Sequence, residues 1–243
     1  MILIKADHDR RIEIPGVPDL VRRPVDIDQS QTGFKALRTL RIYRFDADSV
    51  VKGHAEEDEV FIVVIAGSVE LTMSSDNWAT TQHHFKLAAA SDSGNTPCAA
   101  YLPPHATYQL IPRSETDIAY ARATPSGSRP PEVFTPQFRT IATGGTLLLD
   151  ETTYAERLRL RLVQIDTQPN EVALSLIHES EAMCEALMHV RTVPAKRSAT
   201  VTMADAAPTL LDSWDTVAVP PGESPTLRIA MGSSALAFLV LAE

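Results

Sequence analysis

The segment GHAEEDEVFIVVIAG, residues 53–67, places one histidine and four acidic residues within six positions, directly before an apolar run. Imidazole nitrogens and carboxylate oxygens are donors that Zn, Fe, Mn and Ni accept in proteins. Residues two apart in an extended chain point to the same side, so His54 and Glu56 could share a face, with Glu59 at the start of the next strand. His105, after a Pro-Pro pair, is a further imidazole. These four residues are one candidate metal site, and the alternative is a solvated, charged turn.

A second group of candidate ligands lies in LIHESEAMCEALMHV, residues 176–190. His178 and Glu185 offer an imidazole and a carboxylate, again beside an apolar run. His189 is four residues from Glu185, so the two share a face if this segment is a strand. One imidazole and one carboxylate bind a metal much more weakly than a complete site does. The alternative for His178 is a satisfied polar residue near the mouth of a barrel.

The elements that must position these residues are predicted to be strands. Residues 39–45, TLRIYRF, alternate polar and apolar side chains, as a half-buried strand does. Residues 59–67 are apolar after Glu59 and rich in β-branched side chains, which is typical of a strand covered on both faces. Residues 179–190 could instead form a helix, because Ala, Met, Glu and Leu favour helices. Many short strands at close spacing predict an all-β fold, a sandwich or a barrel.

The two halves of the chain repeat one pattern. In each half an acidic, His-bearing segment precedes an apolar strand, and a later strand ends in Pro-Pro, in AAYLPPHATYQL (99–110) and in DTVAVPPGESPTLRI (215–229). A proline-rich stretch separates the halves and is predicted to be extended. We therefore expect an N-terminal barrel at 1–124, a linker at 125–139 and a C-terminal barrel at 140–243.

These features resemble the two sequence motifs of the cupin superfamily. The motifs are LRIYRFDADSVVKGHAEEDEVFIVVIAGSVELT, AAYLPPHATYQL and DTVAVPPGE, together with the linker. Two copies indicate a bicupin. Within the bicupins the chain is similar to the 5-deoxy-glucuronate isomerase family of inositol catabolism, which is related to the 5-keto-4-deoxyuronate isomerases. The resemblance implies an all-β chain of two tandem cupin barrels, each a double-stranded β-helix or jelly roll.

The resemblance also implies a divalent metal, Zn, Mn, Fe or Ni, in the second barrel, held by His-x-His, a Glu and a later His. His178 and Glu185 match two of these positions, but Ser180 and Ser224 stand at the other two. A neutral hydroxyl competes weakly with water for such a metal, so we predict a partly eroded site whose metal is weakly bound or absent. The resemblance implies no metal in the first barrel, where Tyr108 stands at the position of the last imidazole.

The activity that the resemblance implies is aldose–ketose isomerisation of a sugar acid, a deoxy-glucuronate. A metal would stabilise the enediolate, and a carboxylate could carry the proton. Arg159 and Arg161 alternate with Leu in RLRLRL and suit the substrate carboxylate if they face the interior; otherwise they pair with acids across strands. One alternative is a catalytically inactive bicupin that binds a small acid or has a structural or regulatory role. Another is a metal-dependent dioxygenase centred on His54 and Glu59.

Composition narrows the range of partners. A net charge of -9 argues against a nucleic-acid binder, which usually presents a basic face. No apolar run approaches the roughly 20 residues of a membrane span, and the first residues lack a signal-peptide pattern. Two cysteines imply no disulfide framework. We expect a cytoplasmic protein with a small-molecule partner, no nucleic acid and no membrane. Unpaired barrel edges make a homodimer a candidate assembly.

Overall fold

The computed structural model describes residues 1–75, 82–91, 94–127, 129–142, 144–155, 157–167, 171–193, 199–203 and 207–243. Strands dominate it, as the sequence predicts. In the first half they are β1 (Ile2–Ile4), β2 (Arg11–Ile12), β3 (Val21–Asp28), β4 (Leu37–Phe45), β5 (Val51–His54), β6 (Glu59–Ala66), β7 (Ser68–Ser74), β8 (His83–Ala88), β9 (Ala99–Leu102), β10 (Thr107–Pro112) and β11 (Thr116–Ala123).

The second half continues in the same way. Its strands are β12 (Glu132–Phe134), β13 (Arg139–Thr140), β14 (Thr146–Glu151), β15 (Arg159–Asp166), β16 (Val172–Ser175), β17 (Glu185–Val193), β18 (Ala199–Thr202), β19 (Thr209–Leu211), β20 (Thr216–Val219), β21 (Thr226–Ile229) and β22 (Ser234–Ala242). The helical elements described are α1 (Gln29–Thr32) and the 3-10 turn η1 (Glu179–Glu181). Residues 179–190, the alternative helix, therefore contain one 3-10 turn and most of a strand.

The strands form two jelly-roll units with the same sheet order. The first unit has a seven-stranded sheet, β12-β9-β6-β11-β4-β3-β2, and a four-stranded sheet, β5-β10-β7-β8. The second unit has the matching sheets β1-β20-β17-β22-β15-β14-β13 and β16-β21-β18-β19. Each strand of one sheet has a counterpart at the same place in the other unit. The prediction of two tandem jelly rolls is confirmed.

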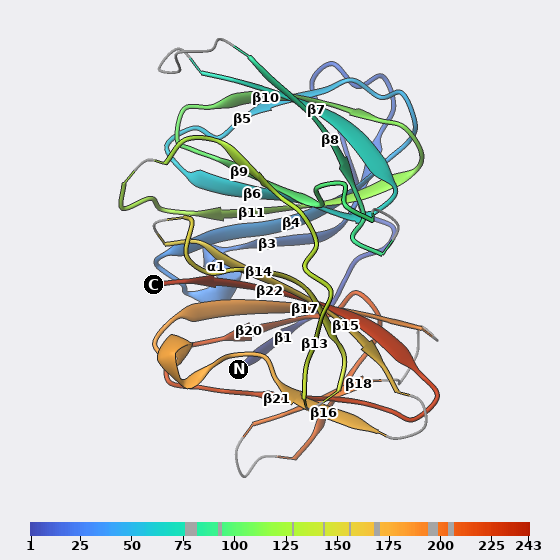
Figure 1. The fold of residues 1–243 in the computed structure, drawn as a ribbon, viewed down its shortest axis with the longest axis vertical. Coiled ribbons are helices and arrows are strands. Elements are labelled where there is room, and N and C mark those ends of the chain that lie inside the picture. Colours follow the sequence, from blue (N-terminus) through green and yellow to red (C-terminus); the bar gives the residue numbers. More distant parts are fainter. Residues whose placement is uncertain are drawn as a thin grey trace.

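The units stack so that the two seven-stranded sheets lie in the middle and the four-stranded sheets lie outside (Figure 1). One buried core joins the central sheets and contains Leu40 and Ile42 of β4 with Leu160 and Leu162 of β15. Each unit also has one core of its own, between its two sheets. The central strands are thus covered on both faces, which explains the unbroken apolar runs of β6 and β22.

The sheets differ from the predicted domain boundaries in two places. The N-terminal strand β1 pairs with β20, with Ile2 opposite Ala218, so it belongs to the second unit although residues 1–124 were predicted to form the first barrel. Strand β12 lies within the predicted linker 125–139 but pairs with β9 of the first unit. The edge strand of each seven-stranded sheet, β12 in the first unit and β1 in the second, therefore lies outside the sequence pattern that the two halves repeat. These short segments have no periodicity that would identify them as strands.

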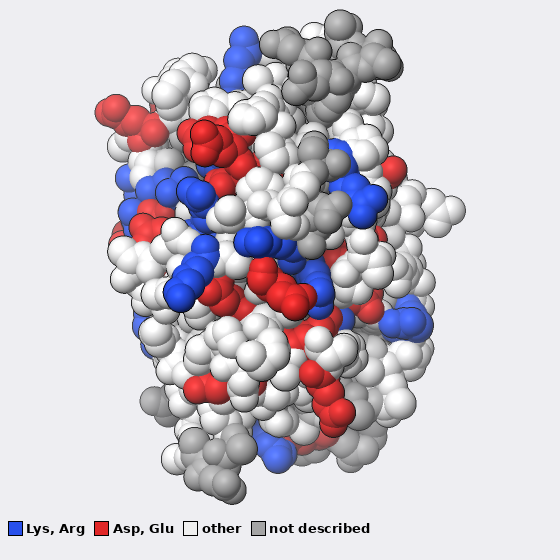
Figure 2. Space-filling view, turned by 90° about the vertical axis from the view of Figure 1, so that its left-hand side faces the viewer, with Lys and Arg blue, Asp and Glu red and all other residues white. Residues whose placement is uncertain are grey.

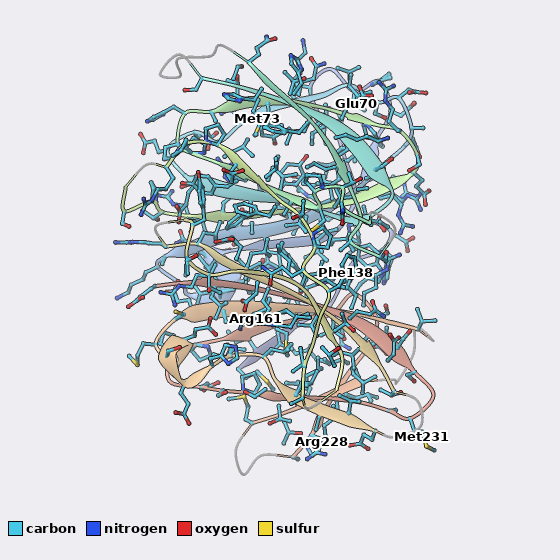
Figure 3. The ribbon with its side chains drawn as sticks, viewed as in Figure 1. Glu70, Met73, Phe138, Arg161, Arg228 and Met231 are labelled. Carbon is cyan, nitrogen blue, oxygen red and sulfur yellow. The ribbon has the colours of Figure 1, made fainter. Side chains whose placement is uncertain are left out.

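Side chains fill the space between the sheets, and Arg161 lies within the second unit while Met231 lies at the periphery (Figure 3). On the face shown in Figure 2, acidic and basic side chains are interspersed. This matches the many ion pairs between described residues, such as Arg113 with Glu70 at 2.5 Å. Among the described residues, no helix has the length and apolar character that crossing a membrane requires.

Candidate functional site

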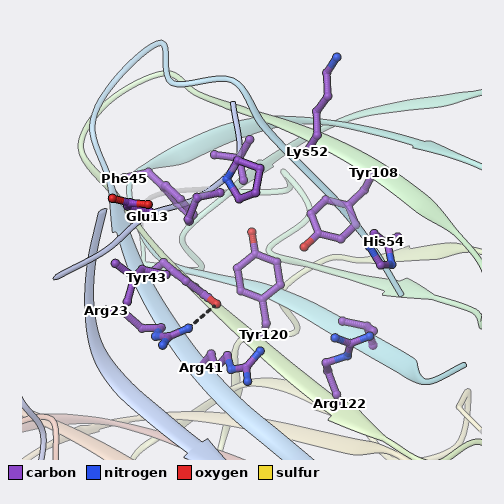
Figure 4. Close-up of a pocket in the computed structure, with 15 residues that line it drawn as sticks. Glu13, Arg23, Arg41, Tyr43, Phe45, Lys52, His54, Tyr108, Tyr120 and Arg122 are labelled. Carbon is purple, nitrogen blue, oxygen red and sulfur yellow. Dashed lines mark hydrogen bonds between the residues drawn. The ribbon is translucent and has the colours of Figure 1, made fainter. Parts of the chain in front are cut away.

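A cavity of about 270 Å³ opens between the two sheets of the first unit (Figure 4). We call it the first-unit cavity. It is lined by Ile12, Glu13, Ile14, Pro15, Arg23, Arg41, Tyr43, Phe45, Val51, Lys52, His54, Val60, Tyr108, Tyr120 and Arg122. Three guanidinium groups and three phenols thus surround a space near the lower end of the range for small-molecule pockets. Such a lining suits a small anion that carries hydroxyl or carbonyl groups.

Strand alternation explains why these polar side chains point inward. Strands β4 and β11 pair antiparallel, with Arg41 opposite Tyr120. Because successive side chains in a strand point to opposite faces, the residues between them, such as Ile42 and Ala121, enter the core shared with the second unit. The polar side chains of β4 and β11, on the other face, therefore point into the interior of the first unit.

Arg23 and Arg41 are held in place by one carboxylate. Asp26 Oδ2 lies 2.8 Å from Arg23 Nη2, and its Oδ1 lies 3.0 Å from Arg41 Nε. Arg10 also pairs with Asp26. Arg23 Nη1 donates to the Tyr43 hydroxyl over 3.5 Å. A single acid shared among three guanidinium groups leaves positive charge and N–H donors facing the cavity.

Arg122 is fixed from the other side of the cavity. Its Nε lies 3.2 Å from Asp58 Oδ2, its Nη2 lies 3.3 Å from Glu56 Oε2, and it donates to the Ala55 carbonyl oxygen. Burial raises the pKa of Asp58 although Arg122 and Arg38 oppose that shift. The carboxylates therefore orient Arg122 without enclosing it, since the residue remains part of the cavity wall.

The phenols form a cluster at the centre of the cavity. The Tyr120 ring lies 5.2 Å from the Tyr43 ring and 5.9 Å from the Tyr108 ring, centroid to centroid. Burial raises the pKa of Tyr108 to about 12 and that of Tyr120 well above its usual value. Both hydroxyls therefore remain protonated near neutral pH. The buried Tyr120 hydroxyl lies near the Tyr108 hydroxyl but makes no hydrogen bond of good geometry among the described residues, so it can turn to donate to a ligand oxygen.

His54 lies at the cavity mouth, with its side chain 62% exposed and its Nδ1 atom 3.7 Å from Glu56 Oε1. Any side chain at the preceding residue, Gly53, would displace the Tyr108 ring. A Cβ atom at Gly53 would lie 2.4 Å from the Cζ and Oη atoms of Tyr108. The Tyr108 ring thus lies directly against the backbone of β5 and forms the wall beside His54.

The structure separates the first group of predicted ligands. His54 and Glu56 are neighbours, but Glu59 is fully buried, and its Oε1 accepts from the backbone N–H groups of Arg157 at 3.0 Å and Leu158 at 2.6 Å. His105 is an exposed turn residue with φ of 65°. Glu59 was predicted from its place before an apolar strand, but its carboxylate instead holds the chain that enters β15.

Glu185 makes the equivalent contact in the opposite direction. Its carboxylate accepts from the backbone N–H groups of Lys35 at 2.5 Å, Ala36 at 2.8 Å and Leu37 at 2.8 Å, where the chain enters β4. Glu59 and Glu185 occupy the same register position in the two units, opposite Ala123 and Ala242 respectively. The two carboxylates therefore form a reciprocal clamp between the units.

A second cavity, of about 220 Å³, lies in the second unit and is lined in part by Asp150, Arg161 and His178. Buried Arg161 donates to both Glu181 oxygens at 3.0 Å, to Asp150 Oδ1 at 3.0 Å and to the Leu176 carbonyl at 2.5 Å. Burial opposes the charge on Glu181, but Arg161 and the His178 N–H outweigh it and lower its pKa. Arg161, predicted to bind substrate, is thus occupied by protein groups.

The other predicted residues of the second unit are also dispersed. The Ser224 hydroxyl lies 3.1 Å from the Ser175 hydroxyl. Arg159, the other predicted substrate residue, pairs with Glu243 at 3.0 Å. Buried His189 contacts Thr216 through Nδ1 at 3.1 Å, and burial lowers its pKa to about 3.

These contacts bear on the metal that the resemblance implies. Within the described part of the chain, no three His, Cys, Asp or Glu side chains gather as a metal site. The Glu185 carboxylate is occupied by backbone N–H groups, while exposed His178 lies at the second cavity. The donor set therefore does not fit the implied His, His, Glu, His arrangement. A metal held by His178 and Glu185 stays a prediction.

The sequence analysis did not identify Arg41, Tyr43, Tyr120 and Arg122, which line the first-unit cavity. A signal was present in the alternation of residues 39–45 and 116–123. Residues 39–45 were interpreted as a half-buried strand, and the polar positions of residues 116–123 were not interpreted. The polar positions of both strands face inward because the second unit covers the apolar side.

Comparisons with known proteins agree with this fold. The KduI/IolB family matches residues 20–149. An IolB-like protein from Salmonella typhimurium LT2 is similar at a TM-score of 0.70 and 13% identity, over 100% of this chain and 93% of that one. The oxalate decarboxylase of Lactobacillus farciminis is similar at a TM-score of 0.71 and 7% identity, over 100% and 86%. At these identities the structures show the fold alone. No curated protein matches the chain in sequence.

Proposed function

The chain belongs to the KduI/IolB family, and we propose that it isomerises a small sugar acid between its aldehyde and keto forms in the first-unit cavity. The family is that of the 5-keto-4-deoxyuronate isomerases. The observation that carries the proposal is the convergence of three guanidinium groups and three phenols on one small cavity. A deoxy-glucuronate of inositol catabolism as substrate and a cytoplasmic location are part of the proposal.

The guanidinium groups account for the acid. Arginine binds carboxylates through two parallel N–H donors, and charge-assisted hydrogen bonds of this kind are stronger than neutral ones. Arg122 and Arg41 flank the Tyr120 ring in the view of Figure 4. In the proposal they hold the substrate carboxylate, and their own acids, Asp58 and Asp26, keep them oriented.

The phenols account for the carbonyl. Isomerisation removes a proton from the carbon beside the carbonyl, and negative charge develops on the carbonyl oxygen. Donors placed in advance at that oxygen stabilise the charge as it forms. Tyr108 and Tyr120 are suited to this task because burial raises the pKa of each hydroxyl and keeps it protonated.

His54 is the proposed proton carrier. An imidazole can accept the proton from one carbon and return it to the former carbonyl carbon, while the hydroxyl proton of the first carbon passes to the old carbonyl oxygen through the Tyr120 and Tyr108 hydroxyls. The Glu56 carboxylate lies 3.7 Å from Nδ1 and can orient the ring. No step of this scheme uses a metal, because the donor set described above does not fit one.

A second candidate function is binding of a sugar acid without catalysis. The observation in its favour is the exposure of His54, whose side chain is 62% exposed at the cavity mouth rather than enclosed beside the phenols. A base in open solvent exchanges its proton with water, so it is poorly placed to return that proton to the same substrate.

Calorimetry and proton NMR in D₂O separate the candidates, with 5-deoxy-glucuronate and galacturonate as probes. Arg122→Leu should weaken binding roughly 10- to 100-fold, as expected for a lost charge-assisted hydrogen bond. Tyr120→Phe and His54→Ala should abolish isomerisation while the acid still binds. Arg228→Leu, which changes an exposed arginine of the second unit, is the control and should change nothing.

Each result decides between the candidates. Binding with solvent deuterium incorporation at the carbon beside the carbonyl supports the isomerase. Binding without exchange or turnover supports the acid-binding protein instead. If neither probe binds, both candidates are wrong for this cavity.

A further inference from the structure

Among the described residues that line the first-unit cavity, Glu13 is the one that carries a carboxylate. Its side chain makes no hydrogen bond or ion pair within that part of the chain. The other acids beside the cavity, Asp26, Asp58 and Glu56, each pair with one or more of the cavity's arginines. Glu13 therefore offers a ligand a strong hydrogen-bond acceptor in a lining whose guanidinium and phenol groups are donors.

The backbone at Glu13 is ordered by contacts on both sides. Glu13 directly follows β2, in which Ile12 lies opposite Val21 of β3. The turn after it is closed by the Val17 N–H, which donates to the Ile14 carbonyl oxygen over 3.0 Å. Ile12 and Ile14 also pack against the core of the first unit. The protein therefore does not have to order this stretch of backbone when a ligand arrives, which lowers the cost of binding.

Glu13 and His54 lie on opposite sides of the cavity (Figure 4). Glu13 is on the side of Phe45, whereas Arg122 is on the side of His54. In the proposed function Arg122 and Arg41 hold the carboxylate of the sugar acid, and the phenols hold its carbonyl oxygen. The hydroxyl groups of the remaining carbons are then left to face the wall that contains Glu13. Because like charges repel, Glu13 also directs the carboxylate of the ligand toward the arginines.

We infer that Glu13 is a specificity-determining residue, whose carboxylate accepts hydrogen bonds from the hydroxyl groups of a single sugar acid. This inference rests on the proposed function and specifies how the cavity selects its substrate class. A hydrogen bond from a hydroxyl to a carboxylate is stronger than one to a neutral acceptor. An unsubstituted acid of the same length has no hydroxyl to donate, so it gains nothing from Glu13. The cavity thereby prefers polyhydroxy acids to unsubstituted acids.

Calorimetry on the full chain tests this inference with galacturonate, and with hexanoate in competition against it. Glu13→Ala should weaken galacturonate binding about tenfold, as the loss of a charge-assisted hydrogen bond would give. It should leave hexanoate binding unchanged or slightly tighter, so that the preference for the sugar acid falls about tenfold. Glu13→Gln keeps an acceptor oxygen without the charge, and its affinity for galacturonate should lie between those of the parent and Glu13→Ala.

Asp19→Ala is the matched control. Asp19 is an exposed carboxylate in the same connection between β2 and β3, but it is not part of the cavity wall. Its removal lowers the negative charge of the segment by the same amount as Glu13→Ala. Neither galacturonate nor hexanoate should bind differently to this variant, and circular dichroism of each variant checks that the strands are intact.

The outcomes separate this inference from the proposed function. If Glu13→Ala leaves galacturonate binding unchanged, or weakens both ligands equally, Glu13 does not read the hydroxyl groups, while the sugar-acid cavity stands. Equal effects of Asp19→Ala and Glu13→Ala would also overturn the inference, because the cause would then be the charge of the segment. If the parent chain binds no galacturonate, the proposed function is wrong and the inference falls with it.

Discussion

The two units share a sheet order but differ in the lining of their cavities. Arg41 lies opposite Tyr120 in the first unit, and Arg161 lies opposite Leu239 at the same place in the second. The position of Arg122 is likewise taken by Leu241. Of these three positions, only the arginine of β4 and β15 is common to both. The second cavity therefore lacks the phenol and the guanidinium that β11 supplies in the first unit, and its other guanidinium is that of Arg139.

The shared arginine has opposite roles in the two units because a loop differs. In the second unit the connection between β16 and β17, residues 176–184, is longer than residues 55–58, which join β5 to β6. The longer loop brings Glu181 onto Arg161, and both side chains are 5% exposed. The Arg41 side chain is 33% exposed and has the Asp26 carboxylate beside it. The arginine at this strand position is thus enclosed by an acid from the loop in the second unit and left facing the cavity in the first.

The largest expected effect comes from removing this buried cation. Arg161→Met should lower the free energy of unfolding by about 3–5 kcal/mol, because Glu181 is left buried without its partner. Arg41→Met should cost less than about 1 kcal/mol, since its pair with Asp26 is partly exposed. Urea denaturation measures both. Equal losses would contradict the division into a structural and a recognition arginine.

A smaller effect should come from the feature that the units share. Glu59→Ala and Glu185→Ala should each cost about 2–4 kcal/mol of unfolding free energy, because each leaves backbone N–H groups without an acceptor. The exposed neighbours Glu57 and Glu179 provide matched alanine controls, which should change stability little. Metal analysis of the same proteins separates the alternatives: loss of bound metal from Glu185→Ala without loss of stability would support the predicted ligand role.

The sequence predicted the architecture because strand periodicity and the repeated Pro-Pro pattern are local features. It could not predict that Glu59 and Glu185 reach the partner unit, since that contact joins residues about a hundred or more positions apart.

The sequence left open whether Arg161 faces the interior or pairs with an acid across strands. Both hold, since Arg161 is buried and pairs with Asp150 of the neighbouring strand, but its second partner, Glu181, depends on the fold of residues 176–184. The inward orientation of Tyr120 was missed because the second unit, not solvent, covers the other face of β11.

The two units should also respond to pH in opposite directions. Burial opposes the charge on Glu181, but Arg161 and a backbone N–H outweigh it and hold the pKa of Glu181 below its ordinary 4.5. The Glu181 carboxylate therefore stabilises the fold fully above pH 4.5. This stabilisation is lost as the pH falls through the lowered pKa of the folded state. Burial raises the pKa of Asp58 above its ordinary 3.8, so its charge opposes folding at neutral pH, and this penalty disappears as the pH falls toward 3.8.

Charge-removing variants test these signs. Glu181→Gln should lower stability at pH 7, and the loss should shrink below pH 4.5. Asp58→Asn should be nearly neutral or stabilising at pH 7, and its difference from the parent should fade toward pH 3.8. Denaturant unfolding at several pH values gives both curves. Parallel curves for the two variants would contradict the assigned shifts.

The smallest expected effect lies at the Pro-Pro turns. His105 has φ of 65°, and Gly222, at the matching place after Pro-Pro in the second unit, has φ of 86°. A left-handed conformation costs a residue with a Cβ about 1–2 kcal/mol, part of which glycine's greater freedom in the unfolded chain offsets. His105→Gly should therefore raise the unfolding free energy by about 0.5 kcal/mol.

The reverse change completes the comparison. A Cβ at Gly222 would meet no atom within 4 Å, so Gly222→Ala should cost only the backbone strain, about 1 kcal/mol. Sugar-acid binding should be unchanged in both variants, because His105 is an exposed turn residue outside the cavity wall. If His105→Gly instead abolished binding or released a metal, His105 would belong to the functional site. That result would support the first candidate metal site, which includes His105.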